Sequence, residues 1–147
     1  MIRLANSGDI EASLEIALEF IDSGYYSFLP SDINIMRAHA MRALEEPNWL
    51  YLVEDLNGVQ SGFFSAHIEG SLFGKGEIAY QDLMYIRPEY RKGTAAVRFM
   101  RRFEDWARQN NCMSLYFAPS VNVDSRLDRL AKRLGYEYLG PQYGKKL

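Results

Sequence analysis

The order of apolar and polar residues predicts a short strand and two amphipathic helices at the start of the chain. Residues 2–4 have the pattern of a strand, and Ser7 stands where it can cap the next helix. The apolar positions of that helix are Ile10, Leu14, Ala17, Leu18 and Ile21. A second helix is expected to begin at Ser31 and Asp32, and its apolar stripe includes His39 as a packed core residue. The full stripe is Ile35, Met36, His39, Ala40 and Ala43.

From Trp49 onward the pattern changes to one that is typical of strands. Residues 49–56 and 59–68 are rich in β-branched and aromatic side chains. Asn57-Gly58 between them predicts a hairpin turn, because both residues tolerate positive φ. Residues 77–86 follow as a third strand of an antiparallel meander, which Pro88 ends.

The last third of the chain alternates helices and strands. Residues 94–110 give the clearest helical pattern, and a strand at 113–117 and a helix at 124–134 follow. Residues 136–139 and 143–146 are expected to form a final hairpin. The order of elements predicts an α+β fold, an α/β sandwich in which about four helices flank a mostly antiparallel sheet of about six to seven strands.

Length and composition fit a single domain over residues 1–147. Of the 147 residues, 48% are hydrophobic and 14% aromatic, which is enough to bury a sizeable core. We find no signal peptide and no apolar run long enough to span a bilayer, so we expect a cytoplasmic protein with no membrane partner. Cys112 is the sole cysteine, and His39 and His67 show no ligand spacing, which argues against a metal site.

Charge is divided unevenly along the sequence. Residues 1–86 carry four basic and thirteen acidic side chains, a net of −9, whereas residues 87–147 carry thirteen basic and six acidic ones, a net of +7. The cationic half suits a phosphate-bearing ligand and the acidic half a cationic partner, although a solvated helix face explains any one residue more simply. Nucleic acid is a poor candidate, because the aromatic residues are not interleaved with the basic cluster.

Residues 83–96 run from a strand through a tight turn directly into a helix. The start of a helix presents unpaired N–H groups, and small residues at Gly93, Ala95 and Ala96 let a phosphate approach them. Arg91 and Lys92 add positive charge. Ordinary turns of this kind also carry glycine and basic residues, so the pattern by itself leaves both readings open. The P-loop and GxGxxG patterns are absent from the sequence.

This segment resembles the cofactor loop of the GNAT superfamily of N-acetyltransferases. The family reads V/I-x-P-x-Y/F-R and then Q/R-x-x-G-x-G/A. This chain reads Ile86-Arg87-Pro88-Glu89-Tyr90-Arg91, which leads into Arg91-Lys92-Gly93-Thr94-Ala95-Ala96 with Arg91 shared by the two motifs. Thr94 departs from the central glycine of the motif, and a subgroup that reads R-G-G-x-A-A is closer. Residues 57–58 and 133–136 also resemble the family, so the resemblance covers most of the chain.

The resemblance implies a splayed sheet, with acetyl-CoA as co-substrate between the strands at 81–86 and 113–117 and with no metal. Strand backbone groups would pair with the pantetheine arm, and the loop N–H groups would hold the pyrophosphate. Asn122 is a further implied contact, although a turn residue ahead of a helix explains it equally well. Arg126 is one of four cations that either reach the 3′-phosphate or face solvent. The implied cofactor residues are Met84, Tyr85, Ile86, Arg91, Lys92, Gly93, Thr94, Ala95, Ala96 and Asn122.

The implied chemistry is direct attack of an amine on the acetyl thioester, which needs a base for the ammonium and a donor for the leaving thiolate. We select Asp82 as the base, because it lies on the cofactor strand two residues before Met84. A plain solvated carboxylate is the simpler reading of that residue. The rival bases are Glu69, Glu77 and His67.

The thiolate donor departs from the family pattern. The usual donor is a tyrosine four residues before the glycine that ends the helix, and this chain has Ala131 there. Tyr143 is the candidate donor in its place, and the alternatives are Tyr116, Ser120 and water.

The expected function is transfer of acetyl from acetyl-CoA to a primary amine of a small molecule or protein, by direct attack in a ternary complex. The acidic first half suits a cationic acceptor, and a homodimer is left open. Two other classes stay in view, a non-catalytic acyl-CoA-binding or regulatory module and an interaction protein without cofactor. Residues 24–30 form an aromatic loop that fits an acceptor pocket or an interface equally well.

Overall fold

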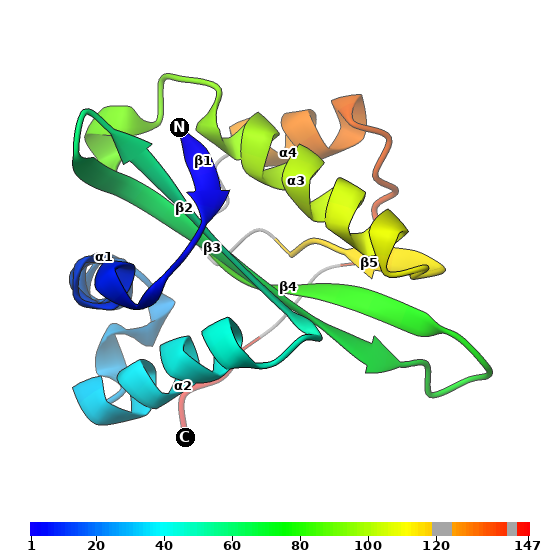
Figure 1. Cartoon of the computed structure of the whole chain (residues 1–147), viewed down its shortest axis with the longest axis horizontal. Helices are drawn as coiled ribbons and strands as arrows, with labels where there is room; N and C mark the ends of the chain where they lie inside the picture. Colours follow the sequence, from blue (N-terminus) through cyan, green and yellow to red (C-terminus); the bar gives the residue numbers. More distant parts are fainter. Residues whose placement is uncertain (119–124, 141–143) are drawn as a thin grey trace.

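The computed structural model describes residues 1–118, 125–140 and 144–147. Its centre is one five-stranded sheet in the order β1-β2-β3-β4-β5 (Figure 1). Adjacent strands run antiparallel, except that β4 and β5 are parallel. The expected α+β architecture is therefore confirmed. The strands are β1 (Ile2–Leu4), β2 (Trp49–Leu56), β3 (Val59–Gly70), β4 (Glu77–Ile86) and β5 (Ser114–Tyr116).

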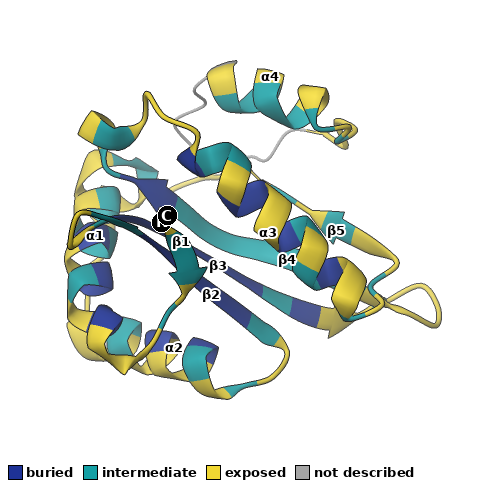
Figure 2. Ribbon diagram, turned by 45° about the horizontal axis from the view of Figure 1, so that its top comes forward, coloured by how far each residue is buried: buried dark blue, intermediate teal, exposed yellow. Residues whose placement is uncertain are grey.

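Helices cover both faces of this sheet. Helices α1 (Ile10–Ser23) and α2 (Ile33–Glu45) pack on one face and α3 (Ala95–Gln109) packs on the other (Figures 1 and 2). Helix α4 (Ser125–Arg133) lies beside α3. Short 3-10 turns join the elements, at η1 (Ser7–Asp9), η2 (Tyr25–Phe28) and η3 (Pro88–Tyr90).

Strands β2 and β3 are buried on both faces, which explains why their sequences are nearly continuous apolar runs. Leu52 and Phe64 belong to the core beneath α3, whereas Val53 and Phe63 belong to the core beneath α1 and α2. Phe64 stacks on Phe99 of α3 with ring centroids 5.9 Å apart. The turn between the two strands has φ values of 55° at Asn57 and 81° at Gly58, as the hairpin signal predicts.

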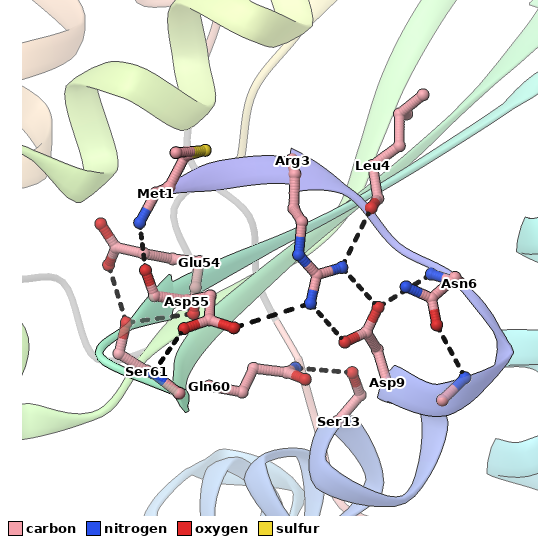
Figure 3. A network of polar contacts seen from close by, with 12 residues as sticks. Met1, Arg3, Leu4, Asn6, Asp9, Ser13, Glu54, Asp55, Gln60 and Ser61 are labelled. Atoms are coloured by element: carbon pink, nitrogen blue, oxygen red, sulfur yellow. Dashed lines mark hydrogen bonds and ion pairs between the residues drawn. The ribbon is translucent and has the colours of Figure 1, made fainter.

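A polar network joins the first strand to the first helix (Figure 3). Arg3 donates to both carboxylate oxygens of Asp9, at 2.7 and 2.8 Å, and Asp9 also accepts the backbone N–H of Asn6 at 2.8 Å. The Asn6 side chain accepts the N–H of Gly8 at 2.9 Å and completes a capping box. Arg3 further pairs with Asp55 of β2 at 3.7 Å, so the network ties three elements together.

Three expectations about local structure are wrong. The cap before α1 is Asn6 and not Ser7, because the chain first makes the 3-10 turn η1. In α2, Ile35 and His39 are exposed, because they border an open cavity between α1, α2 and the sheet instead of packing in the core. Among the described residues the sheet has five strands and not six or seven, because residues 136–139 are not extended into a strand.

Candidate functional site

The structure leaves one edge of β4 open. Strands β4 and β5 pair at Ile78–Tyr80 opposite Ser114–Tyr116, and among the described residues no strand lies beside the second half of β4 on that side. The amide of Arg87 donates to Ser61 O of β3 at 2.9 Å. Because antiparallel bonding alternates, the backbone groups of Met84 and Ile86 then face the open edge while those of Tyr85 face β3. An extended chain with amide groups can pair with such an edge.

A β-bulge at Asp82 changes which face of the sheet each β4 side chain meets. Ser65 of β3 pairs with Leu83 and Ala66 pairs with Gln81, so Asp82 is the extra residue. Alternation is therefore interrupted, and Ala79 and Ile86, seven positions apart, both enter the core beneath α3. A bulge bends a strand away from its neighbour, which accounts for the separation of β4 from β5 at this position.

Unpaired amides gather where β4 leads into α3. In the described part of the chain, the backbone N–H groups of Gly93, Thr94, Ala95 and Ala96 donate to no protein acceptor. The helix dipole adds partial positive charge at the same end. Thr94 has φ of −100°, a value that any residue adopts, so the absence of the motif's central glycine needs no unusual backbone there.

Neither the backbone conformation nor the packing of the described residues requires a glycine at position 93. Its φ is not in the left-handed region, and a Cβ added to it would meet only Tyr90 O, at an ordinary 3.8 Å. The space beside Gly93 is part of a cavity instead. A ligand that approaches this backbone closely is the physical requirement that would exclude a larger side chain.

The cavity has a volume of about 520 Å3 and connects the open strand edge to the start of α3. Seven of the ten residues that the sequence assigned to the cofactor line it, whereas Lys92 and Thr94 do not and Asn122 lies outside the described residues. Arg126 of α4 also lines it, as one of the two alternatives for that cation predicts. The seven are Met84, Tyr85, Ile86, Arg91, Gly93, Ala95 and Ala96.

Sequence reasoning missed part of the cavity wall. Phe20 of α1 and Leu127 and Leu130 of α4 contribute apolar surface, and no local motif marks them. Tyr25 and Tyr26 of the aromatic loop also line the cavity, which places that loop at the site. The loop is covered in turn by the end of the chain, where Lys146 Nζ lies 4.8 Å from the Phe28 ring centroid.

Arg91 forms contacts within the protein that hold the turn after β4. Its Nε donates to Ile86 O at 2.7 Å, and its guanidinium lies 5.1 Å from the centroid of the Tyr85 ring. These contacts fix the turn against the end of β4 and place a positive charge on the cavity wall.

Asp82 lies against His67 of β3. The distance from Asp82 Oδ1 to His67 Nδ1 is 2.7 Å, and the other carboxylate oxygen, Oδ2, is buried without a hydrogen-bond partner in the described part of the chain. Burial raises the pKa of Asp82, and His67 acts in the opposite direction through its charge and hydrogen bond. A carboxylate with a raised pKa and one uncommitted oxygen is suited to accept a proton.

Aromatic rings hold His67 in place across the sheet. Trp49, His67, Tyr80 and Tyr116 occupy matching register positions on β2, β3, β4 and β5. His67 lies 5.2 Å from Trp49 and 5.7 Å from Tyr80, and Tyr80 lies 5.2 Å from Tyr116, as ring centroid distances. The row fixes the orientation of the imidazole that contacts Asp82.

The rival bases fall into two groups. His67 and Glu69 belong to the same cluster as Asp82, with 3.2 Å between His67 Nε2 and Glu69 Oε1. Glu77 is exposed at the far end of β4, five positions before Asp82. The candidate donor Tyr143 and its alternative Ser120 lie outside the described residues, and Tyr116 is stacked on Tyr80.

Neither a metal centre nor a membrane span is found where the structure describes the chain. No group of three His, Cys, Asp or Glu side chains in residues 1–118, 125–140 and 144–147 is placed to hold a metal ion. Each helix in those ranges is too short or too polar to cross a bilayer.

Comparisons with known proteins point to one family. The family model described as the acetyltransferase (GNAT) family matches residues 15–136. No curated protein sequence matches the chain significantly.

Solved structures share the fold at low sequence identity. The chain is similar to the aminoglycoside N-acetyltransferase AAC(6')-Iy in complex with a CoA bisubstrate analogue, with 15% identity, TM-score 0.78 and coverage of 100% of this chain and 97% of the other. The 6'-N-acetyltransferase AAC(6')-IG of Acinetobacter haemolyticus has 16% identity, TM-score 0.74 and coverage of 100% and 99%. An acetyltransferase of Trypanosoma brucei has 15% identity, TM-score 0.76 and coverage of 100% and 99%.

Proposed function

Because the chain belongs to the GNAT family of acetyltransferases, we propose that it moves an acetyl group from acetyl-CoA to a primary amine of a small molecule or protein. The observation that carries the proposal is the set of unpaired amides at the start of α3, which faces a cavity that continues along the open edge of β4. These features fit the two ends of one ligand, a diphosphate and an extended arm with amide groups.

Each part of the cofactor has a matching part of the site. The amides of residues 93–96 would hold the pyrophosphate, with Arg91 and Arg126 supplying charge on the cavity wall. The outward backbone groups of Met84 and Ile86 would pair with the pantetheine arm, except that Ile86 O already accepts Arg91 Nε. Bound acetyl-CoA supplies the activated thioester, and the rest of the chemistry is proton transfer.

Asp82 is the proposed base. Its uncommitted Oδ2 would take a proton from the acceptor ammonium, so that the neutral amine can attack the acetyl carbon. His67 stabilises the ionised carboxylate through Oδ1 and is held by its aromatic neighbours, so we assign it as a positioning residue. The neighbouring structures include aminoglycoside acetyltransferases, which supports a small-molecule amine as the acceptor.

Titration calorimetry with CoA and thiol release from acetyl-CoA test the proposal together. We expect CoA to bind and thiol to be released when a panel of amines is supplied. Gly93→Ala should weaken CoA binding by about tenfold, or about 1.4 kcal/mol, with an unchanged melting temperature, because the added Cβ meets the ligand and not the protein. Gly70→Ala is the matched control, since a Cβ there is likewise free of any close contact and the residue does not line the cavity.

A non-catalytic acyl-CoA-binding module is the second candidate. Ala131 favours it, because this residue offers no hydroxyl where the family pattern has a tyrosine. That candidate predicts CoA binding without thiol release for any amine. Absence of CoA binding would contradict both candidates.

A further inference from the structure

A second cavity lies on the other side of the aromatic loop. It has a volume of about 480 Å3, is open to solvent on one side, and is lined by α1, α2, the loop at η2 and the face of β2, β3 and β4. Phe20 and Tyr26 line both this cavity and the one assigned to acetyl-CoA, so these two rings stand between them. The volume is within the range of small-molecule sites.

The walls of the second cavity are almost entirely apolar. Asp32 is the sole carboxylate among its described lining residues, and its Oδ1 already accepts the N–H of Asn34 at 2.8 Å as the cap of α2. A ligand with several positive charges would need several carboxylates to replace the water that it loses. The acidic side chains of the first half of the chain therefore do not make this cavity a site for a polycation.

One wall carries an unsatisfied polar atom, on the strand next to the proposed base. Ser65 lines the cavity, is 4% exposed and has no hydrogen-bond partner for its Oγ in the described part of the chain. Ser65 pairs with Leu83, the residue after Asp82, and lies two positions from His67 on the same face of β3. The unpartnered oxygens of Ser65 and Asp82 thus flank the same bulge, where an amine has N–H groups to donate.

We propose that this cavity holds the body of the acceptor, and that the acceptor is a primary amine on an apolar group. The inference rests on the proposed acetyltransferase function and names its substrate class. The apolar group would lie against Leu83 and the α1 and α2 side chains, and the amine would donate to Ser65 Oγ. Asp82 itself lines neither cavity, so its Oδ2, at the bulge next to Leu83, would receive the proton through a water molecule. Attack would form the N–C bond and break the C–S bond, with one ammonium proton passing to Asp82 and a second N–H proton leaving with CoA, which departs as the thiol.

The first experiment compares amines of the two classes on the full chain. With acetyl-CoA as donor, kcat/KM for 2-phenylethylamine should exceed that for neamine and for spermidine by about 100-fold. A preference for neamine or spermidine would overturn the inference. Faster thiol release with octanoyl-CoA than with acetyl-CoA, at equal amine, would also overturn it, because the cavity would then hold the acyl chain.

The second experiment separates failure of the inference from failure of the proposed function. Calorimetry measures 2-phenylethylamine binding to the protein saturated with CoA. If 2-phenylethylamine binds but no amine causes thiol release from acetyl-CoA, the cavity assignment stands and catalysis is contradicted. If other amines cause thiol release but 2-phenylethylamine does not bind, the cavity assignment alone is contradicted.

Two variants locate the binding site. Ala17→Phe places a ring in the second cavity and should weaken 2-phenylethylamine binding by about tenfold with unchanged CoA affinity, because Ala17 does not line the first cavity. Ala38→Phe, on the exposed side of α2, is the matched control and should bind normally. Ser65→Ala should weaken 2-phenylethylamine binding by about tenfold without loss of folding, since the Ser65 Oγ bonds to no described protein atom. Normal amine affinity in both Ala17→Phe and Ser65→Ala would refute the site.

Discussion

Asp9 and Asp82 are both largely buried carboxylates beside the central sheet, with side chains 11% and 20% exposed, and each contacts a basic side chain. Both carboxylate oxygens of Asp9 accept hydrogen bonds, since Arg3 donates to each and the backbone N–H of Asn6 donates to one (Figure 3). Asp82 uses one oxygen for His67 and leaves the other without a partner in the described part of the chain.

The pKa values of the two residues move in opposite directions for this reason. The hydrogen bonds from Arg3 lower the pKa of Asp9, because they favour the ionised form more than burial disfavours it. Burial raises the pKa of Asp82, because the single contact with His67 does not offset the lost hydration. A completed polar network stabilises the fold, whereas an incomplete one costs stability and leaves an atom available for chemistry.

The largest expected effect is on activity, in Asp82→Asn. An amide cannot accept the proton, so kcat should fall by about 100-fold or more, while CoA affinity stays unchanged. The melting temperature should stay equal or rise, because the variant removes a buried carboxylate that lacks a full set of partners. Steady-state thiol release and a thermal melt measure both quantities. A rate within twofold of wild type would remove Asp82 as the base.

Asp9→Asn should show the reverse behaviour. It loses the ion pair with Arg3 and keeps one acceptor oxygen in place of two, which should lower the free energy of unfolding by about 2 kcal/mol and the melting temperature by about 5 °C. The kcat of the remaining folded protein should match wild type, since both Asp9 oxygens are already bonded to Arg3 and Asn6 and neither is left to accept a proton. Equal stability of Asp9→Asn and wild type in urea would show that the network contributes little.

A matched pair of variants at His67 sharpens the account of Asp82. His67→Phe keeps a ring between Trp49 and Tyr80 but loses the hydrogen bond, so kcat should fall by about tenfold. Because His67 lowers the pKa of Asp82, its loss should also move the acidic limb of the kcat/KM profile to higher pH. His67→Asn keeps a hydrogen-bond donor, so it should restore part of the lost kcat and reverse part of the shift in the pH profile. A pH profile identical to wild type in His67→Phe would restrict His67 to packing.

The smallest effect is the pH dependence of stability. The lowered pKa of Asp9 means that its contribution is present above the unfolded value of 3.8 and is lost as pH falls through the lower folded value. Asp82 has a raised pKa, so it costs stability progressively as pH rises from 3.8 through its folded value. Urea unfolding from pH 3 to 7 should therefore show that Asp9→Asn loses less unfolding free energy relative to wild type at acid pH than at neutral pH. Any gain in unfolding free energy of Asp82→Asn should also be smaller at acid pH. Parallel curves for all three proteins would contradict both assignments.

Much of the fold and of the cofactor loop could be predicted from the sequence, through its local hydrophobic pattern and the chemistry of its residues. Periodicity predicted the helices and all five observed strands to within a few residues, and for β2 and β3 this follows because both of their faces are buried and Asn57-Gly58 fixes their turn. The segment from Met84 to Ala96 was recognisable as an anion site and as a GNAT loop, since its strand, turn and helix are contiguous. Capping at Asn6 was misassigned, because several residues there have side chains able to cap.

Only the tertiary structure decided which distant residues share the site. His67 reaches Asp82 through strand register and a bulge, and a pattern of side chains along one strand does not reveal an inserted residue in its partner. The two cavities likewise depend on how the loop at η2 packs across α1, α2 and the sheet. Whether a buried oxygen has a partner is a property of three-dimensional packing, and that property separates Asp82 from Asp9.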